Sequence, residues 1–172
     1  MDILIRLIER VSGAFGVIGA VIVAPLIVAT VYEVFSRYLF NAPTIWAYEI
    51  AYMAMGTNFL LGAAVTLRDR GHIRIDLLYG HWPPKTQAVI DIVGYVCLFL
   101  PLAWWLSWGL WKYAYYAYLS GETSGDSAWN PVIWPFRMVF FAGFVLLALQ
   151  ATAELMKAVK VLAGRDAPGA PQ

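Results

Sequence analysis

The sequence predicts an all-α integral membrane protein with four transmembrane helices. Of its 172 residues, 61% are hydrophobic and 13% are charged, whereas soluble domains have about 25% charged residues. Four long apolar segments, each long enough to cross a bilayer, alternate with short polar connectors. Lysine and arginine gather at the two termini and in the middle connector, which indicates how the spans are oriented. We therefore expect one four-helix membrane domain, residues 1–164, with both termini in the cytoplasm.

The first span is predicted at residues 11–35, after a charged amphipathic lead. Its uncharged run of 22 residues exceeds the apolar region of a signal peptide, about 7–15 residues, and no small-residue cleavage site ends it. We therefore expect a retained anchor. Gly16, Ala20 and Ala24 repeat every four residues and form a ridge that would let another helix approach closely.

Glu33 lies near the end of the first span, four residues before Arg37. An ionisable residue in a membrane segment is a functional candidate, and Glu33 would be the proton site of a small four-span exporter. Glu33 is about one turn from the charged boundary at Arg37, which favours a carboxylate that is paired or that reaches the membrane surface instead. In the connector that follows, Thr44 is expected to cap the next helix.

The second span is predicted at residues 45–67. Trp46 suits the aromatic belt at the membrane surface, and Glu49 falls in the first turn, where a carboxylate favours the helix dipole. Asn58 lies in the middle of the apolar run. We expect its side chain to hydrogen-bond a neighbouring helix rather than to bind a substrate.

The connector at residues 68–85 contains four of the twelve basic residues and both histidines. Its apolar residues recur at helical spacing, which predicts a short helix lying on the membrane surface. The two prolines at 83 and 84 are expected to end this helix and to start the third span, at residues 86–111. Tryptophans crowd the far end of that span, as in an interfacial girdle.

A polar connector at residues 120–134 precedes the fourth span, predicted at 133–159. Arg137 and Glu154 lie near its ends and are expected to reach the membrane surface or to pair within an assembly. Gln150 lies one turn before Glu154 on the same helix face. The last eight residues, 165–172, are rich in proline, glycine and alanine and predict a disordered tail.

The orientation follows from the basic residues. Nine of the twelve lie at the termini and in the middle connector, and three, Arg37, Lys112 and Arg137, border the other two connectors. The positive-inside rule then places the termini and the middle connector in the cytoplasm.

Several function classes are excluded. The one cysteine, Cys97, rules out an intrachain disulfide and a cysteine metal cluster, and its apolar context predicts a buried thiol. The sequence contains no HExxH, GxSxG or P-loop motif. Neither histidine lies in a span, so a haem-binding bundle lacks its axial ligands. The net charge of +1, without a basic block, gives no footprint for nucleic acid. We expect a protein that is not an enzyme and binds no cofactor or metal.

Three sequence pieces occur in order along the chain: Arg-Tyr-Leu-Phe-Asn at 37–41, followed by Pro43, Trp46 and Glu49; Phe-Leu-Leu-Gly-Ala-Ala at 59–64; and Arg68 with Gly-His-Ile-Arg-Ile-Asp at 71–76. On this four-span frame they resemble the small, DctQ-like membrane subunit of tripartite ATP-independent periplasmic (TRAP) transporters, over residues 25–155. The segment Gly-Glu-Thr-Ser at 121–124, with Trp134, Pro135 and Gln150, resembles a subgroup associated with 2-oxo acids and other organic acids.

This resemblance implies a permease subunit of the bacterial inner membrane. Such a system combines a periplasmic solute-binding protein with a large membrane subunit, a sodium-driven elevator that holds the sodium and substrate sites. The small subunit would brace the large one and help dock the binding protein, with lipid around it. Two alternatives stay open: the exporter that uses Glu33, and an accessory subunit of a membrane redox complex.

The resemblance and the patterns above give a set of candidate site residues. Glu122 and Asp126 are the candidates for docking the binding protein. The candidates for subunit contacts are Gly16, Ala20, Ala24, Arg37, Trp46, Glu49, Asn58, Arg68, His72, Arg74, Asp76, Gln150 and Glu154.

Overall fold

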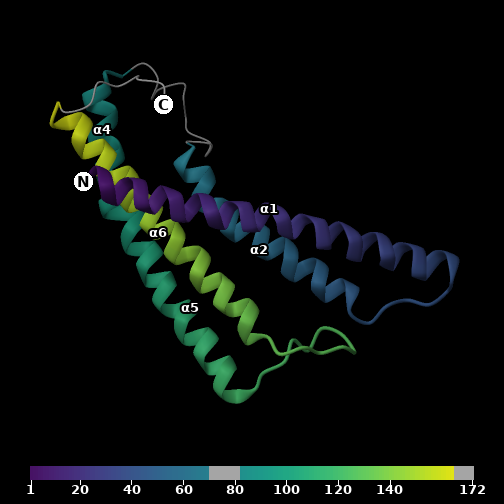
Figure 1. Cartoon of the computed structure of the whole chain (residues 1–172). Coiled ribbons are helices and arrows are strands. Elements are labelled where there is room, and N and C mark those ends of the chain that lie inside the picture. Colours follow the sequence, from purple (N-terminus) through teal and green to yellow (C-terminus); the bar gives the residue numbers. More distant parts are fainter. Residues whose placement is uncertain (70–81, 165–172) are drawn as a thin grey trace.

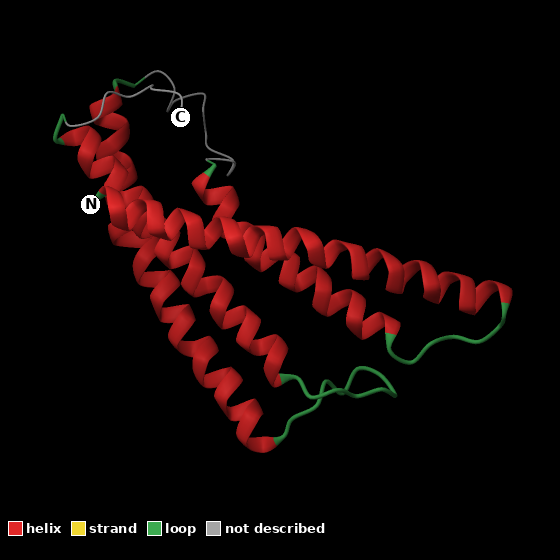
Figure 2. Cartoon of the chain, in the orientation of Figure 1, coloured by secondary structure: helices red, strands yellow, loops and turns green. Residues whose placement is uncertain are grey.

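The computed structural model describes residues 1–69 and 82–164. Figure 2 shows helices joined by loops in these ranges. Four helical rods among them are long and apolar enough to cross a membrane: α1 (Asp2–Leu39), α2 (Ala47–Arg68), the rod Lys85–Ser120 and α6 (Trp134–Leu162). The predicted all-α class with four candidate spans is confirmed. The expected surface helix in the middle connector and the expected disordered tail at 165–172 lie outside the described residues.

Helix α1 is longer than the span expected at 11–35. It runs without interruption for 38 residues, Asp2–Leu39, which corresponds to about 57 Å at 1.5 Å per residue. The hydrocarbon core of a bilayer is only about 30 Å thick. The charged lead therefore forms the first turns of the same helix, and α1 extends beyond the apolar layer.

The third rod consists of α4 (Pro84–Gly94), a π-helical turn η1 (Tyr95–Phe99) and α5 (Leu100–Ser120). Pro101 lies two residues after the end of the π turn, with Leu100 between them. Proline cannot donate to the carbonyl four residues earlier, and its ring crowds that carbonyl, so a local widening of the helix relieves the conflict. The rod continues past the expected end at residue 111 as far as Ser120. Cys97 in the π turn is exposed, so its predicted burial is wrong: it lies on the outside of a peripheral helix.

The helices form two arms that diverge from a shared end. In Figure 1, α1 and α2 run together to one side, and α5 and α6 run together to the other. Helix α6 contacts α1, α2, α4 and α5. In its most apolar window, 39% of the residues are buried within the chain, against 11% in α1 and 6% in the third rod. Helix α6 is therefore the centre of the bundle, and the outer faces of α1 and α5 remain for lipid or a partner.

Small residues let the arms meet. A Cβ atom added at Gly143 of α6 would lie 2.9 Å from the Cβ of Leu60 on α2, and one at Gly56 would lie 2.9 Å from the Phe136 ring. Ala148, Ala151 and Ala153 on α6 are fully buried. The contact between α2 and α6 is thus close-packed, with little space between the two backbones.

The connector between α5 and α6 is a compact turn. Gly121 ends α5 in the left-handed conformation, φ +62°, and the N–H of Glu122 donates to the carbonyl of Ala117 at 3.1 Å; this is the Schellman arrangement that glycine favours. A bridge between Thr123 and Val132 then holds the two strands of the turn together. The turn reaches back towards the start of α2.

Candidate functional site

A buried polar network joins α1 to α6 near the N-terminus. The Ser12 hydroxyl donates to Gln150 Oε1 at 2.9 Å, and Gln150 Nε2 donates to Glu154 Oε1 at 3.1 Å. Lys157 Nζ lies 2.7 Å from Glu154 Oε1 and 2.6 Å from Glu9 Oε1. We call these five residues the helix network. Gln150 and Ser12 are almost completely buried, and the network holds the two helices in one register.

Arg68 at the end of α2 joins this region from the helix beside α1. Its Nη1 donates to the carbonyl of Glu9 on α1 at 3.4 Å, and its Nε donates to Asp69 Oδ1 at 2.8 Å. The hydrogen bond from Arg68 lowers the pKa of Asp69 below its usual value. The other candidates in the middle connector, His72, Arg74 and Asp76, lie outside the described part of the chain.

The ridge of small residues expected on α1 does not lie on one contact face: Gly16 contacts α2, and Ala20 and Ala24 do not share this contact. A Cβ at Gly16 would lie 2.4 Å from Val65 Cγ2, so α1 and α2 are in close contact at Gly16. Ala20 and Ala24 are exposed and remain open to a partner. The prediction for Asn58 is confirmed: its Nδ2 donates to the carbonyl of Gly19 on α1 at 2.8 Å.

Glu33, expected to be paired or to reach the membrane surface, forms an ion pair with Arg37. Arg37 Nη2 and Nε lie 2.5 and 2.8 Å from Glu33 Oε1. The other oxygen of Glu33 accepts from the backbone N–H of Thr44 at 2.8 Å and from its hydroxyl. The predicted cap is therefore wrong: α2 begins at Ala47, and Thr44 ties the connector to α1 instead. The Trp46 ring stacks on Tyr32 of α1 at 5.7 Å between ring centroids.

The carboxylate of Glu49 joins the two arms at their open end. Glu49 lies in the first turn of α2, as expected, and is fully buried. Its Oε1 accepts from the hydroxyl of Ser127 in the connector between α5 and α6. The Ser127 oxygen in turn accepts from the N–H of Trp129 at 3.1 Å. In the described chain, Glu49 Oε2 and the hydroxyl oxygen of Ser124 are buried without a hydrogen-bond partner.

Arg137 and Glu122 form a two-pronged pair beside this contact. Arg137 Nη1 and Nη2 donate to the two oxygens of Glu122 at 2.6 and 2.5 Å. The guanidinium also lies over the Tyr113 ring, 3.6 Å from its centroid. The hydrogen bonds from Arg137 lower the pKa of Glu122 below its usual value. We call Glu49, Glu122, Asp126, Ser127 and Arg137 the connector cluster.

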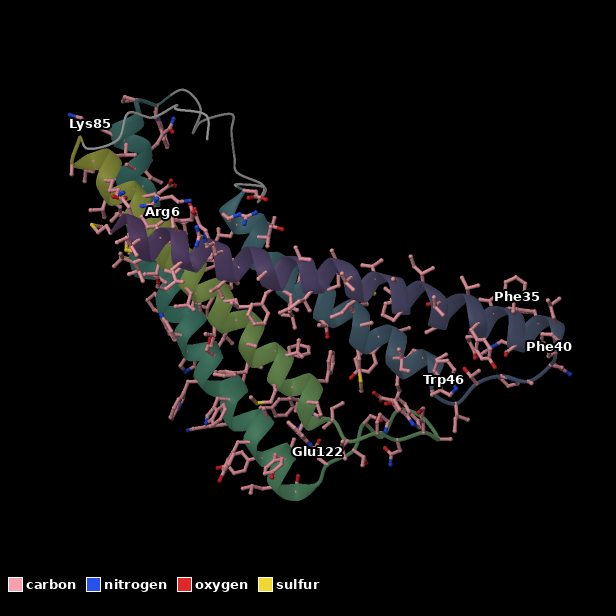
Figure 3. The ribbon with its side chains drawn as sticks, viewed as in Figure 1. Arg6, Phe35, Phe40, Trp46, Lys85 and Glu122 are labelled. Atoms are coloured by element: carbon pink, nitrogen blue, oxygen red, sulfur yellow. The ribbon has the colours of Figure 1, made fainter. Side chains whose placement is uncertain are left out.

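A cavity of about 390 Å³ opens beside the connector cluster, of which Asp126 and Arg137 line it. Its walls come from α2, α5, α6 and the connector, and include Tyr52, Tyr113, Ser124, Asp126, Phe136 and Arg137. Figure 3 shows Glu122 and Trp46 at the ends of the two arms, far from Arg6 and Lys85. The cavity therefore lies at the end of the molecule opposite the N-terminus.

Residues 1–69 and 82–164 contain no group of three or more His, Cys, Asp or Glu placed to hold a metal ion. Arg137 and Glu154, expected to reach the surface or to pair in an assembly, both pair within this chain. The arrangement can bind a partner or fix the geometry of the bundle.

Sequence reasoning missed several members of the two sites. Glu9, Ser12 and Lys157 were not singled out, although the spacing of Glu154 and Lys157, three residues apart, was a readable signal. Ser127 was also missed. Its contact with Glu49 spans 78 residues of chain, and no local pattern could indicate it.

Comparison with known proteins places these features in a family. The family described as "Tripartite ATP-independent periplasmic transporters, DctQ component" matches residues 26–161. A relative is the sialic acid TRAP transporter permease protein SiaT of Haemophilus influenzae (strain 86-028NP), which is 32% identical over 72 residues. The match covers 40% of this chain and 12% of that protein's length.

Proposed function

The chain belongs to the DctQ component of the tripartite ATP-independent periplasmic transporters, and from this premise we propose that it is the static frame of a sodium-coupled uptake system for an organic acid. It is a non-catalytic subunit of the inner membrane. On this proposal a large membrane subunit carries the sodium and substrate sites, and a periplasmic binding protein delivers the solute.

The observation that carries the proposal is the placement of the paired ionisable groups. They form contacts near the two ends of the bundle, in the helix network and the connector cluster. In the middle of α2, Asn58 is engaged by the carbonyl of Gly19. Transporters bind their solutes near the membrane midplane, whereas a frame needs a fixed shape. Ion pairs at the two ends of the bundle and close packing between α2 and α6 support the role of a frame.

The charge distribution supports an orientation for this frame. The termini and the middle connector carry most of the basic residues and would face the cytoplasm. There Arg68, with His72, Arg74 and Asp76, would clamp the large subunit. The exposed residues Ala20 and Ala24 on α1 offer a smooth surface for one of its helices. Glu122 and Asp126 would then face the periplasm and the binding protein.

The substrate class is also part of the proposal. The name of the relative identifies that protein as a permease for sialic acid, which is itself a carboxylic acid. The resemblance of residues 121–124 to an organic-acid subgroup points to the same chemistry. We infer an organic acid, of the 2-oxo acid or dicarboxylate class.

The test is reconstitution in lipid vesicles. Vesicles that contain this chain, the large subunit and the binding protein should accumulate organic acid when a sodium gradient is applied. Omitting this chain should abolish accumulation, and the chain alone should transport nothing. Solute or proton flux with the chain alone would favour the exporter, although both carboxylate oxygens of Glu33 are already engaged. Haem absorbance in the purified chain would favour a redox subunit.

A second test concerns the clamp. Arg68→Ala or Asp76→Ala should reduce the amount of large subunit that co-purifies with this chain. Full recovery of the pair from both variants would remove the clamp from the proposal.

A further inference from the structure

The cavity beside the connector cluster has aromatic walls. Tyr52 and Phe136 meet edge to face, with 5.1 Å between ring centroids, and Phe136 meets Phe140 in the same way at 4.9 Å. Tyr113 closes another side. Aromatic faces carry partial negative charge and attract cations.

The charges around the cavity leave an excess of carboxylate. Arg137 is committed to Glu122 through both of its terminal nitrogens and is stacked on Tyr113. Asp126 lines the cavity and is exposed. Neither Asp126 nor Glu49 forms an ion pair within residues 1–69 and 82–164. Tyr52, on the cavity wall, lies within the electrostatic reach of both carboxylates.

Two buried polar atoms beside the cavity have no hydrogen-bond partner in the described chain. Glu49 is fully buried, and its Oε2 has no hydrogen-bond partner in the described chain; the same holds for the Ser124 hydroxyl on the cavity wall. Buried polar atoms nearly always have a partner, because an unmet one costs about 1–3 kcal/mol. A donor that enters the cavity would pair with the Ser124 hydroxyl, because Ser124 lines the cavity. Glu49 is not a lining residue and acts on the cavity through its charge.

We propose that the cavity receives the cationic end of a lysine or arginine side chain of the periplasmic binding protein. This inference rests on the proposed function and names the contact that docks the partner. Asp126 at the rim attracts the cation, the rings of Tyr52 and Phe136 flank its alkyl stem, and Glu49 contributes negative charge from below.

The dimensions favour a side chain over a bare ion. A volume of about 390 Å³ is far larger than a dehydrated metal ion needs, and the described residues place no three acidic, histidine or cysteine groups together. The cavity also lies beside the exposed connector, at the end that faces the periplasm on the proposed orientation. A protein that settles on this end can insert a long side chain without rearranging the helices.

The experiment uses the complete transporter in lipid nanodiscs and the purified binding protein. Asp126→Asn and Glu49→Gln each remove one negative charge while keeping the side-chain size. We expect each to raise the Kd for the binding protein about threefold to tenfold, as for the loss of one interfacial ion pair. The dependence of Kd on salt should become weaker in both variants. Thr123→Trp, which fills the cavity mouth, should raise the Kd as well.

A matched control is Asp2→Asn, which removes a carboxylate at the opposite end of the molecule, where Asp2 pairs with Lys160. Its Kd should equal that of the wild type. Recovery of the large subunit by each variant confirms that the complex is intact.

The outcomes separate this inference from the proposed function. If both charge variants keep the wild-type Kd and salt dependence, while uptake still requires the binding protein, the cavity is not the docking contact and the frame function stands. If the wild-type transporter accumulates organic acid without any binding protein, both proposals fail. Restored affinity when Asp126→Lys is combined with an acidic replacement of one basic residue on the binding protein would identify the inserted side chain.

Discussion

The helix network and the connector cluster contain the same kinds of polar residue, but these residues are bonded in different ways. In the helix network, Ser12, Gln150 and Lys157 reach their partners directly from one helix to another. In the connector cluster, Glu49 reaches a loop residue, Ser127, and keeps one oxygen without a partner in the described chain. In the helix network, each of the five side chains has a hydrogen-bond or ion-pair partner. In the connector cluster, Glu49 Oε2 has none in the described chain.

This difference separates stability from recognition. A buried polar group contributes to stability when all its partners are present, and it lowers stability when one is missing. The helix network should therefore be the part of the molecule that resists unfolding. The connector cluster should contribute less to stability, because Glu49 is buried with one oxygen that has no hydrogen-bond partner in the described chain. Removing one carboxylate charge at each end, from Glu154 or from Glu49, should therefore affect stability differently.

The largest effect is expected in the helix network. Gln150→Ala should lower the free energy of unfolding by about 2–4 kcal/mol, since it opens a cavity and leaves the Ser12 hydroxyl without its acceptor. Most of this loss is packing, because hydrogen bonds between membrane helices contribute only about 0.6 kcal/mol on average. Unfolding in mixed detergent micelles measures it. Thr152→Ala is the control, since its hydroxyl bonds Ala148 of its own helix; an equal loss there would refute a special role for the network.

The sharpest comparison pairs two isosteric changes. Glu154→Gln removes the charge that Lys157 faces at 2.7 Å and should cost about 1–3 kcal/mol. Glu49→Gln keeps the contact with Ser127 through its amide oxygen and removes an uncompensated buried charge. It should leave stability unchanged or raise it by about 1 kcal/mol. Thermal unfolding of both variants in one detergent tests this. Destabilisation by Glu49→Gln would mean that the carboxylate serves the fold.

A smaller and more local effect is expected for the loop contact. Ser127→Ala leaves both oxygens of Glu49 without a partner among the described residues and should cost about 1 kcal/mol. Because Ser127 also accepts the N–H of Trp129, the change should loosen the connector in particular. Hydrogen exchange measured by mass spectrometry should rise in residues 122–133 and stay constant in α1. Uniform acceleration along the chain would contradict a local role.

The spans and the local pairs were predictable from the sequence. Each apolar segment had to become a helix, since only helices or closed barrels satisfy the backbone in lipid. The pair of Glu33 and Arg37 follows from their spacing of four residues, and the bond from Asn58 follows from the cost of an unpaired amide among apolar residues. The Glu33–Arg37 pair and the need of Asn58 for a partner are visible within one or two turns of the chain, although the carbonyl that Asn58 reaches lies 39 residues away.

The long-range contacts were not predictable in the same way. Whether Thr44 caps α2 or binds Glu33 depends on how the first connector folds back, and the tertiary contact prevailed over the local preference. Glu49 meets Ser127 only because α2 and α6 cross at Gly56 and Gly143, which sets the distance between the arms. The cavity follows from the same crossing. A sequence gives the residues for such a site but not the angle that brings them together.

The smallest effect is expected for the pair of Arg137 and Glu122, and it should depend on pH. Arg137 lowers the pKa of Glu122 in the folded protein below the usual 4.5. The pair therefore contributes its full stability above that usual pKa, and the contribution disappears as the pH falls through the lowered folded value. The difference in unfolding temperature between the wild type and Glu122→Gln should be constant from neutral pH to about pH 5 and should shrink in more acidic buffer.

The partial exposure of Glu122, whose side chain is 47% accessible, keeps this difference small because solvent screens the pair. Adding Arg137→Gln to both proteins should remove the pH dependence, since the guanidinium is its source. If the difference stays constant down to pH 3, the pair does not stabilise the connector. The turn would then be held by Ser127, by the hydrogen bond from the Gly125 N–H to Asn130 Oδ1 and by its backbone bridge.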